Sequence, residues 1–459
     1  MIFDHLLDFS DRIALIEEGK RITYSELINA ADNLVKDIPS RSVVLMRFAN
    51  DYLSVLAYVG FLRKKIVSLI VNPQLDKEHI EEVCSRFQPN YIFSSKDNYG
   101  DEIVQSSEGT IFKTSNATIP KTDEDLAILL TTSGSTGSPK FVRLSYKNLQ
   151  ANTESICEYL SINREDRGIT CLPLYYSFGL SLLNTHLYAG ASIVVTDQSY
   201  MSPLFWTQLI QQQVTTFSGV PYTFSILRRL GLDNIDLSNV RYVTQAGGKL
   251  GKDDVEYWID FFSQRSIRFI VMYGQTEATA RMSYLPPEYA RKNSASIGIA
   301  IPGGEFHLYD GEKIINEPNI EGELVYKGGN VSLGYAETVY DLCKGDENKG
   351  ELFTGDIAYS DEKGYYFIVG RKKRFLKLFG NRTNLDEIER MLKDNGVENL
   401  CSGKDDNLRV YILKNTFIEK VNELIRTKTL INPTAYKVVV LDKFPISDSG
   451  KVLYSNLPY

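Results

Sequence analysis

The stretch LAILLTTSGSTGSPKFVRLSYKNL, residues 126–149, decides the fold and sets the first expectation about function. It begins with an apolar run, residues 126–130, which predicts a buried strand. In the loop TTSGSTGSPK that follows, glycines let backbone N–H groups converge, Ser and Thr add hydroxyl donors, and Lys140 adds a cation. A strand followed by such a loop predicts a polyphosphate-binding site.

A flexible Gly/Ser linker is the competing interpretation of this loop. A linker seldom carries a lysine between two apolar, strand-like segments, so phosphate binding is favoured. The loop is not a Walker loop, because Gly137 is followed by Ser-Pro-Lys rather than by Lys-Ser or Lys-Thr.

Helices and strands alternate on the amino-terminal side of the loop. The spacing of apolar residues predicts, in chain order, helix 24–36, strand 42–46, strand 66–71 and helix 79–87. Beyond the loop, Ser145 is placed to cap a helix that continues to about Leu160. This alternation predicts an α/β fold with a largely parallel sheet.

Composition narrows the class of protein. A net charge of −7 over 459 residues argues against a nucleic-acid partner, which usually needs a basic face. The five cysteines are odd in number and form no CxxC pair, which predicts reduced thiols, and the four scattered histidines disfavour a His/Cys metal site. No signal peptide is visible, and the most apolar stretch, residues 52–62, suits a buried helix rather than a membrane span. We therefore expect a cytoplasmic protein with no integral membrane segment.

The stretch FIVMYGQTE, residues 269–277, is a strand followed by a polar loop. Tyr273 can stack on a purine, Thr276 can donate to a phosphate, and Glu277 is a hard oxygen ligand suited to the magnesium that accompanies ATP. An ordinary polar loop after a strand is the alternative.

Two further strand ends carry candidate nucleotide contacts. The stretch VRYVTQAGGKL, residues 240–250, ends in Gly247 and Gly248, and such a pair lets a flat ligand approach the backbone. In LFTGDIAY, residues 352–359, Asp356 is placed at a turn to grip two ribose hydroxyls, and Arg371 closes a later strand within reach of a nucleotide. Plain turns are the alternative for both.

Taken together, these motifs closely resemble those of the adenylate-forming superfamily, and in style the acyl-CoA synthetases most. The superfamily also includes aryl-CoA synthetases, carrier-protein ligases, peptide-synthetase adenylation domains and firefly luciferase. Its usual loop reads T-S-G-S-T-G-x-P-K-G-V and then Ser-His, whereas this chain has Phe141 for the last glycine and Tyr146 for the histidine.

The resemblance implies roles for further residues. The segment CLPLYYSFG, residues 171–179, matches the one that borders the acyl pocket, so Tyr176 and Phe178 become pocket candidates. Lys451, in DKFPISDSGKV, matches the adenylation lysine, and Lys373 lies where the family has its interdomain hinge. The neighbouring Lys372 and Arg374 are interpreted as solvated charges.

The candidate residues are then as follows: catalytic Lys451, Thr276 and Glu277, with Glu277 also the metal ligand; phosphate-binding Thr132, Ser133, Gly134, Ser135, Thr136, Gly137 and Lys140; adenine- and ribose-binding Gly247, Gly248, Tyr273, Gly274, Asp356 and Arg371; acyl-pocket Tyr176 and Phe178; and hinge Lys373.

The resemblance also implies the architecture. We expect a large N-terminal domain of layered α/β subdomains plus a β-rich subdomain over residues 1–370, and a hinge at 371–375. Residues 376–459 are expected to form a small, mobile α+β C-terminal domain that acts as a lid.

The implied reaction is ATP-dependent activation of a carboxylic acid to acyl-AMP with Mg²⁺, followed by transfer to a thiol. CoA is the favoured acceptor, a carrier-protein phosphopantetheine is the alternative, and a non-catalytic nucleotide- or acyl-binding homologue is a third reading. The acid itself is not identified. The pocket segment 174–179 holds no acidic residue to pair with an ammonium, so we expect an uncharged acyl or aryl group, with or without hydroxyls, rather than a free amino acid.

Overall fold

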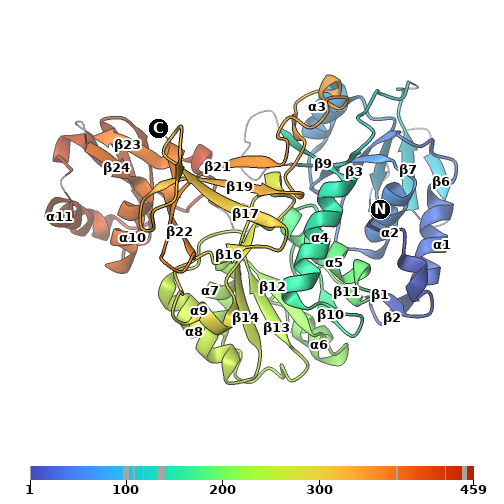
Figure 1. The fold of residues 1–459 in the computed structure, drawn as a ribbon, viewed down its shortest axis with the longest axis horizontal. Helices are drawn as coiled ribbons and strands as arrows, with labels where there is room; N and C mark the ends of the chain where they lie inside the picture. The colour runs from blue at the N-terminus through green and yellow to red at the C-terminus, as the bar shows by residue number, and fades with distance from the viewer. Residues whose placement is uncertain are drawn as a thin grey trace. The chain divides into compact units, whose positions relative to one another are not determined.

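The computed structural model describes residues 2–96, 103–106, 109–116, 118–131, 140–378, 381–429, 431–446 and 452–458. The chain divides into two compact units (Figure 1). The first comprises Met1–Glu305 with Tyr326–Leu352, and the second comprises Phe306–Val325 with Phe353–Tyr459.

One sheet of the first unit carries the strand that precedes the predicted phosphate loop. Its described strands lie in the order β20-β9-β8-β4-β3-β5-β7-β6. Their bounds are β3 (Val43–Arg47), β4 (Val67–Val71), β5 (Tyr91–Ser94), β6 (Ile103–Ser106), β7 (Gly109–Lys113), β8 (Leu126–Thr131), β9 (Phe141–Ser145) and β20 (Gly334–Ala336). Strands β5, β3, β4 and β8 are parallel neighbours, whereas β9 runs antiparallel to β8. Every residue of β3 and β4 is buried, as in parallel strands covered on both faces.

A second sheet of this unit lies in the order β16-β15-β14-β13-β12-β10-β11-β1-β2. Its strands are β1 (Ile13–Glu17), β2 (Lys20–Thr23), β10 (Arg167–Ile169), β11 (Ser192–Val195), β12 (Thr216–Gly219), β13 (Tyr242–Gln245), β14 (Arg268–Tyr273), β15 (Ser283–Tyr284) and β16 (Ile299–Ala300). Strands β10, β12, β13 and β14 pair in parallel, so their carboxyl ends share one edge, where open α/β sheets bind ligands.

Helices connect these strands. They are α1 (Tyr24–Leu34), α2 (Tyr52–Arg63), α3 (Lys77–Phe87), α4 (Tyr146–Leu160), α5 (Ser177–Tyr188), α6 (Pro203–Gln211), α7 (Pro221–Leu230), α8 (Lys252–Ser263) and α9 (Pro287–Ala290). Thr23 and Glu26 form a capping box at α1, and Ser145 and Asn148 form one at α4. Helices α4 and α5 pack against each other (Figure 1).

The second unit is built mainly from antiparallel strands. One sheet, most of whose residues belong to this unit, has the order β18-β17-β19-β21-β22, with β17 (Gly304–Tyr309), β18 (Ile314–Ile315), β19 (Gly322–Gly328), β21 (Glu351–Ser360) and β22 (Tyr366–Arg371). The remaining elements are β23 (Phe375–Leu378), β24 (Asn381–Asn384), α10 (Leu385–Asp394), β25 (Asn399–Lys404), β26 (Asn407–Ile412), α11 (Ile418–Lys428) and β27 (Tyr436–Val440). Leu392, Val410 and Ile425 are fully buried in its core.

The predicted α/β fold is confirmed. The predicted helices correspond to α1, α3 and α4, and the predicted strands to β3, β4 and β8. Among the described residues, no helix combines the length and apolar character that a membrane crossing needs. The domain division at residues 371–375 stays a prediction, and these residues fall within the second unit.

Candidate active site

The predicted phosphate loop is held between two described strands. Strand β8 leads into it, and Lys140 precedes the return strand β9. Thr132, Ser133, Gly134, Ser135, Thr136 and Gly137 lie outside the described residues. Lys140 Nζ lies 2.7 Å from Glu337 Oε1, and both side chains are more than half exposed. Such a pair is worth at most about 1 kcal/mol, so Lys140 can exchange Glu337 for a more highly charged phosphate.

The predicted magnesium ligand, Glu277, lies in the short 3₁₀ helix Thr276–Ala278 that follows β14. Its Oε1 accepts a hydrogen bond of 2.8 Å from the Tyr335 hydroxyl. Burial, and then the charge of Glu277, raise the pKa of Tyr335, so the phenol stays protonated as a donor. The carboxylate of Glu277 is thereby oriented, and its second oxygen suits a hard cation.

Strand β20 brings Lys140 and Glu277 together. It pairs antiparallel with β9, and Tyr335 lies opposite Val142. Tyr335 lies within β20, and Glu337 is the first residue after the strand ends at Ala336. One short segment therefore contacts both the predicted phosphate lysine and the predicted magnesium ligand. Sequence reasoning missed Tyr335 and Glu337, because no local pattern marks them.

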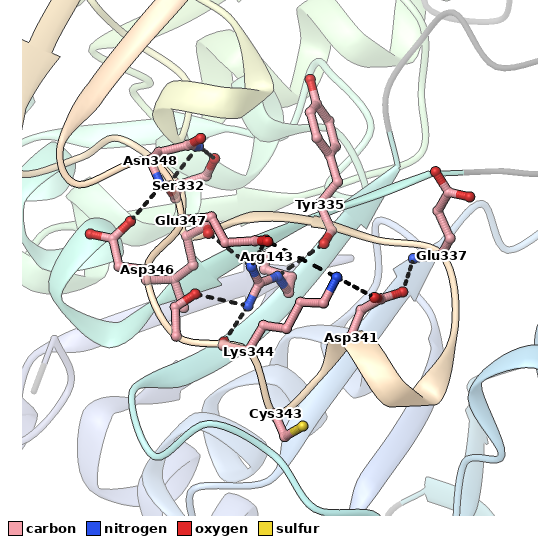
Figure 2. A network of polar contacts seen from close by, with 12 residues as sticks. Arg143, Ser332, Tyr335, Glu337, Asp341, Cys343, Lys344, Asp346, Glu347 and Asn348 are labelled. Carbon is pink, nitrogen blue, oxygen red and sulfur yellow. Dashed lines mark hydrogen bonds and ion pairs between the residues drawn. The ribbon is translucent and has the colours of Figure 1, made fainter.

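A buried arginine fixes the segment that carries Tyr335 (Figure 2). The Arg143 side chain is fully buried in β9, and Nη2 lies 2.5 Å from a Glu347 carboxylate oxygen. Its guanidinium donates to the carbonyls of Tyr335 at 3.1 Å and Leu333 at 2.9 Å, and also to that of Lys344. Figure 2 shows the Tyr335 ring pointing away from Arg143. The arginine thus holds the backbone while the phenol remains available to Glu277.

The predicted glycines follow two neighbouring strands, β13 and β14, at the carboxyl edge of the second sheet. Gln245 of β13 pairs with Val271 of β14, so the residues that follow each strand leave the sheet side by side. Gly247 has φ of +81°, which favours glycine. A Cβ on Gly274 would lie 1.8 Å from a backbone carbonyl oxygen, so no side chain fits there. Tyr273 ends β14 beside this turn.

The acyl-pocket candidates lie at the start of α5, next to the same edge. Ser177 Oγ lies 3.3 Å from Thr276 Oγ1. A Cβ on Gly247 would lie 3.9 Å from the Phe178 ring, which is buried. Tyr176 is half-buried and packs on Tyr175, with ring centres 4.5 Å apart. The structure therefore brings Thr276, Gly247 and Phe178 to one place.

Asp356 and Arg371 form a pair within the second unit. They face each other across β21 and β22, with Arg371 Nε 3.1 Å from Asp356 Oδ1. Asp356 is 3% exposed, whereas the Arg371 side chain is 64% exposed. The pair presents a carboxylate and a guanidinium together. The side chain of Lys373, and all of Lys451, lie outside the described residues.

The interpretation of Arg374 as a solvated charge is wrong. Its side chain is 13% exposed, and Nη2 lies 2.6 Å from Glu389 Oε1. The guanidinium also pairs with Asp386 and lies 4.0 Å from the centre of the Tyr454 ring. Tyr454 donates to the other Glu389 oxygen at 2.9 Å. The cluster is buried by contacts that are distant in sequence, and a local charge run does not reveal them.

Comparison with known proteins gives consistent matches. Residues 3–336 match the family model described as AMP-binding enzyme. The chain is 25% identical to an oxalate–CoA ligase of Arabidopsis thaliana, over 97% of this chain and 94% of that one. It is also 25% identical to a 2-succinylbenzoate–CoA ligase of Bacillus cereus, over 97% and 95%.

Two solved structures share the fold. One is o-succinylbenzoate CoA synthetase (MenE) from Bacillus subtilis with its acyl-adenylate intermediate, with a TM-score of 0.80 at 20% identity over 98% of this chain and 97% of that one. The other is ATP-bound MatB from Rhodopseudomonas palustris, with a TM-score of 0.80 at 20% identity over 99% and 97%. At this identity they show the fold alone.

Proposed function

The chain belongs to the AMP-binding enzyme family, and we propose that it is an AMP-forming acid–thiol ligase with CoA as its acceptor. In the first half-reaction a carboxylate oxygen attacks the α-phosphorus of ATP, and pyrophosphate leaves. In the second, a thiolate attacks the acyl carbon of acyl-AMP, and AMP leaves. The observation that carries the proposal is the segment 335–337, at the end of β20, which contacts both Lys140 and Glu277.

The first half-reaction must bring two anions together, so charge control dominates its chemistry. Lys140 follows the predicted phosphate loop and supplies a positive charge there. Glu277, oriented by Tyr335, would hold Mg²⁺, which neutralises phosphate charge when bound. We propose that Lys451 supplies a further cation to this step, and that rotation at Lys373 exchanges the two half-reactions.

The nucleoside contacts remain part of the proposal. Gly247, Gly248, Tyr273 and Gly274 would border the adenine, because they leave the sheet at its ligand-binding edge. The carboxylate of Asp356 would accept from two ribose hydroxyls, with Arg371 beside it.

The choice of CoA rests on the relatives, which are CoA ligases by name. A carrier-protein phosphopantetheine carries the same thiol chemistry and remains the alternative. The named acids of the relatives include oxalate, 2-succinylbenzoate and a long-chain fatty acid, so the comparisons leave the acid open.

The test is pyrophosphate release with ATP, Mg²⁺ and a panel of carboxylic acids, followed by thioester formation with CoA or with a holo-carrier protein. Lys140→Met is expected to lower pyrophosphate release at least tenfold. Lys147→Met is the matched control, because Lys147 also makes an exposed ion pair, with Asp125 at 3.0 Å. Nucleotide binding without pyrophosphate release for any acid would instead support the non-catalytic homologue.

A further inference from the structure

A small internal cavity lies behind the acyl-pocket candidates in the first unit. It has a volume of about 20 Å³ and is lined by residues of α4, α5 and the strands β12 and β13. Its lining includes the apolar Ile156 and Leu182 and the hydroxyls of Ser218 and Thr244. A cavity of this size admits about one water-sized group.

The cavity lies along the face of α5 that also carries Phe178. Ser181, Leu182, Thr185 and His186 line it, and they follow Phe178 at helical spacing. Phe178 itself lies beside Gly247 at the ligand-binding edge of the sheet. Arg281 both contacts the Phe178 ring and lines the cavity, so a group attached to the reacting carboxylate beside Phe178 would approach it.

Arg281 lines the same cavity and is 4% exposed. Its guanidinium carbon lies 3.9 Å from the centre of the Phe178 ring. Its guanidinium shares a hydrogen bond with the buried Tyr159 hydroxyl, whereas its Nε–H has no hydrogen-bond partner among the described residues. Burial lowers the pKa of Arg281. A buried N–H without an acceptor is destabilising, and Tyr159 is a neutral partner, so the Arg281 Nε–H can still take an oxygen acceptor.

The position of Arg281 cannot easily relax. Its backbone carbonyl accepts hydrogen bonds from Asn152 at 3.0 Å and from Asn330 at 2.9 Å. These bonds anchor the arginine backbone from α4 and from the segment before β20. The guanidinium is thus held against Phe178 rather than turned outward.

His186 adds an acceptor to the lining. Its Nδ1 lies 2.9 Å from the Leu182 carbonyl oxygen, which assigns the proton to Nδ1 and leaves Nε2 as an acceptor. Nε2 is buried and has no partner. Burial lowers the pKa of His186, so the ring is neutral near pH 7. The described walls of the cavity therefore offer both an unused donor and an unused acceptor.

We infer that this cavity receives the far end of the acyl group, and that Arg281 selects short acids whose chain carries an oxygen that accepts a hydrogen bond. The inference rests on the proposed function and names its substrate class. A plain alkyl chain leaves the Arg281 Nε–H unsatisfied, and an ammonium group meets a like charge. Either a hydroxyl or a second carboxylate would supply the accepting oxygen, and the substrates compared below distinguish the two groups.

The experiment compares pyrophosphate release with butyrate, 4-hydroxybutyrate and succinate, which differ only at the far end. Wild-type kcat/KM is expected to be at least about tenfold higher for one of the oxygenated acids than for butyrate. Arg281→Met keeps the apolar stem and is expected to abolish this preference, while Arg281→Lys is expected to keep part of it. Arg265→Met is the matched control, because Arg265 stacks 3.8 Å from the centre of the Phe261 ring away from the cavity.

Thermal shift with each acid and no ATP gives a readout that is independent of turnover. The inference would be overturned if the wild type bound and activated all three acids without preferring the oxygenated ones. It would also be overturned if a folded Arg281→Met variant kept the preference. Either result leaves the proposed function intact. Absence of both a shift and pyrophosphate release with every oxygenated acid would also overturn it. Binding without pyrophosphate release would count against the proposed function instead. A preference for 4-hydroxybutyrate identifies a hydroxyl as the group, and one for succinate a carboxylate.

Discussion

Tyr335→Phe removes one hydroxyl and keeps the ring. The lost interaction is the 2.8 Å hydrogen bond to Glu277 Oε1. Hydrogen bonds to charged groups contribute about 1.5–3 kcal/mol when buried. Tyr335 is 44% exposed, so water replaces part of the loss, and about 1 kcal/mol is a reasonable expectation. That corresponds to about a fivefold change in an equilibrium constant.

The Tyr335→Phe change should weaken the apparent affinity for Mg²⁺. We expect the Mg²⁺ concentration that half-saturates pyrophosphate release to rise about fivefold, with the melting temperature nearly unchanged. Tyr340→Phe is the matched control, because Tyr340 is 80% exposed in the same segment. An unchanged magnesium response in the folded variant, or an equal change in the control, would refute the role assigned to Tyr335.

The pH dependence gives a second check on the same contact. Burial and the Glu277 charge raise the pKa of Tyr335, so the donor form is favoured in the folded protein. The contribution is therefore complete below the ordinary tyrosine pKa of about 10 and is lost only as pH rises through the raised value. The ratio of wild-type to variant activity should stay constant between about pH 6 and pH 9.

Three further outcomes are expected. Gly274→Ala should destabilise the fold by about 3 kcal/mol, because its Cβ would lie 1.8 Å from a carbonyl oxygen, while Gly251→Ala, which meets only a side-chain oxygen at 3.7 Å, should be tolerated in a urea titration. Arg374→Met should lower the free energy of unfolding by about 3–5 kcal/mol, because Glu389 is then buried without its cation. In urea titrations this loss should shrink at acid pH, because burial raises the pKa of Glu389 and protonation removes its charge. Lys451→Ala should abolish acyl-AMP formation yet convert supplied acyl-AMP to thioester; equal loss of both half-reactions would contradict this.

Elements with a strong local signal were predictable from the sequence. The cap at Ser145 and the helix that it starts are present as α4, because capping and helical periodicity depend on residues three or four apart. The apolar stretch 52–62 predicted a buried helix, and α2 has buried residues at every position from Ser54 to Leu62. The strand end that carries Tyr273 followed from the same local rules. The turn expected at Asp356 is wrong, because Asp356 lies inside β21 and pairs there with Arg371 of β22.

Contacts that join distant segments were not predictable. Strand β20 has three residues, too few to show a period, and its place beside β9 depends on pairing with a strand far earlier in the chain. Without that pairing, nothing in the sequence relates Tyr335 to Glu277. The burial of Arg374 likewise depends on Glu389 and Tyr454, which fold back from later elements. Arg281 gave no local signal, because its proposed role depends on one buried Nε–H that the fold leaves unpaired.

The two faces of the β9–β20 pair explain why residue 334 is a glycine and residue 335 a tyrosine. Residues opposite each other across antiparallel strands share a face, so Tyr335 lies on the side of Val142, and Gly334 on the side of Arg143. A Cβ on Gly334 would lie 2.9 Å from Arg143 Nη2, so glycine there makes room for the guanidinium. One face is thus committed to burying the arginine that fixes the strand. The other face carries Tyr335, which donates to Glu277. The glycine at position 334 therefore helps to fix the direction in which the Tyr335 phenol points.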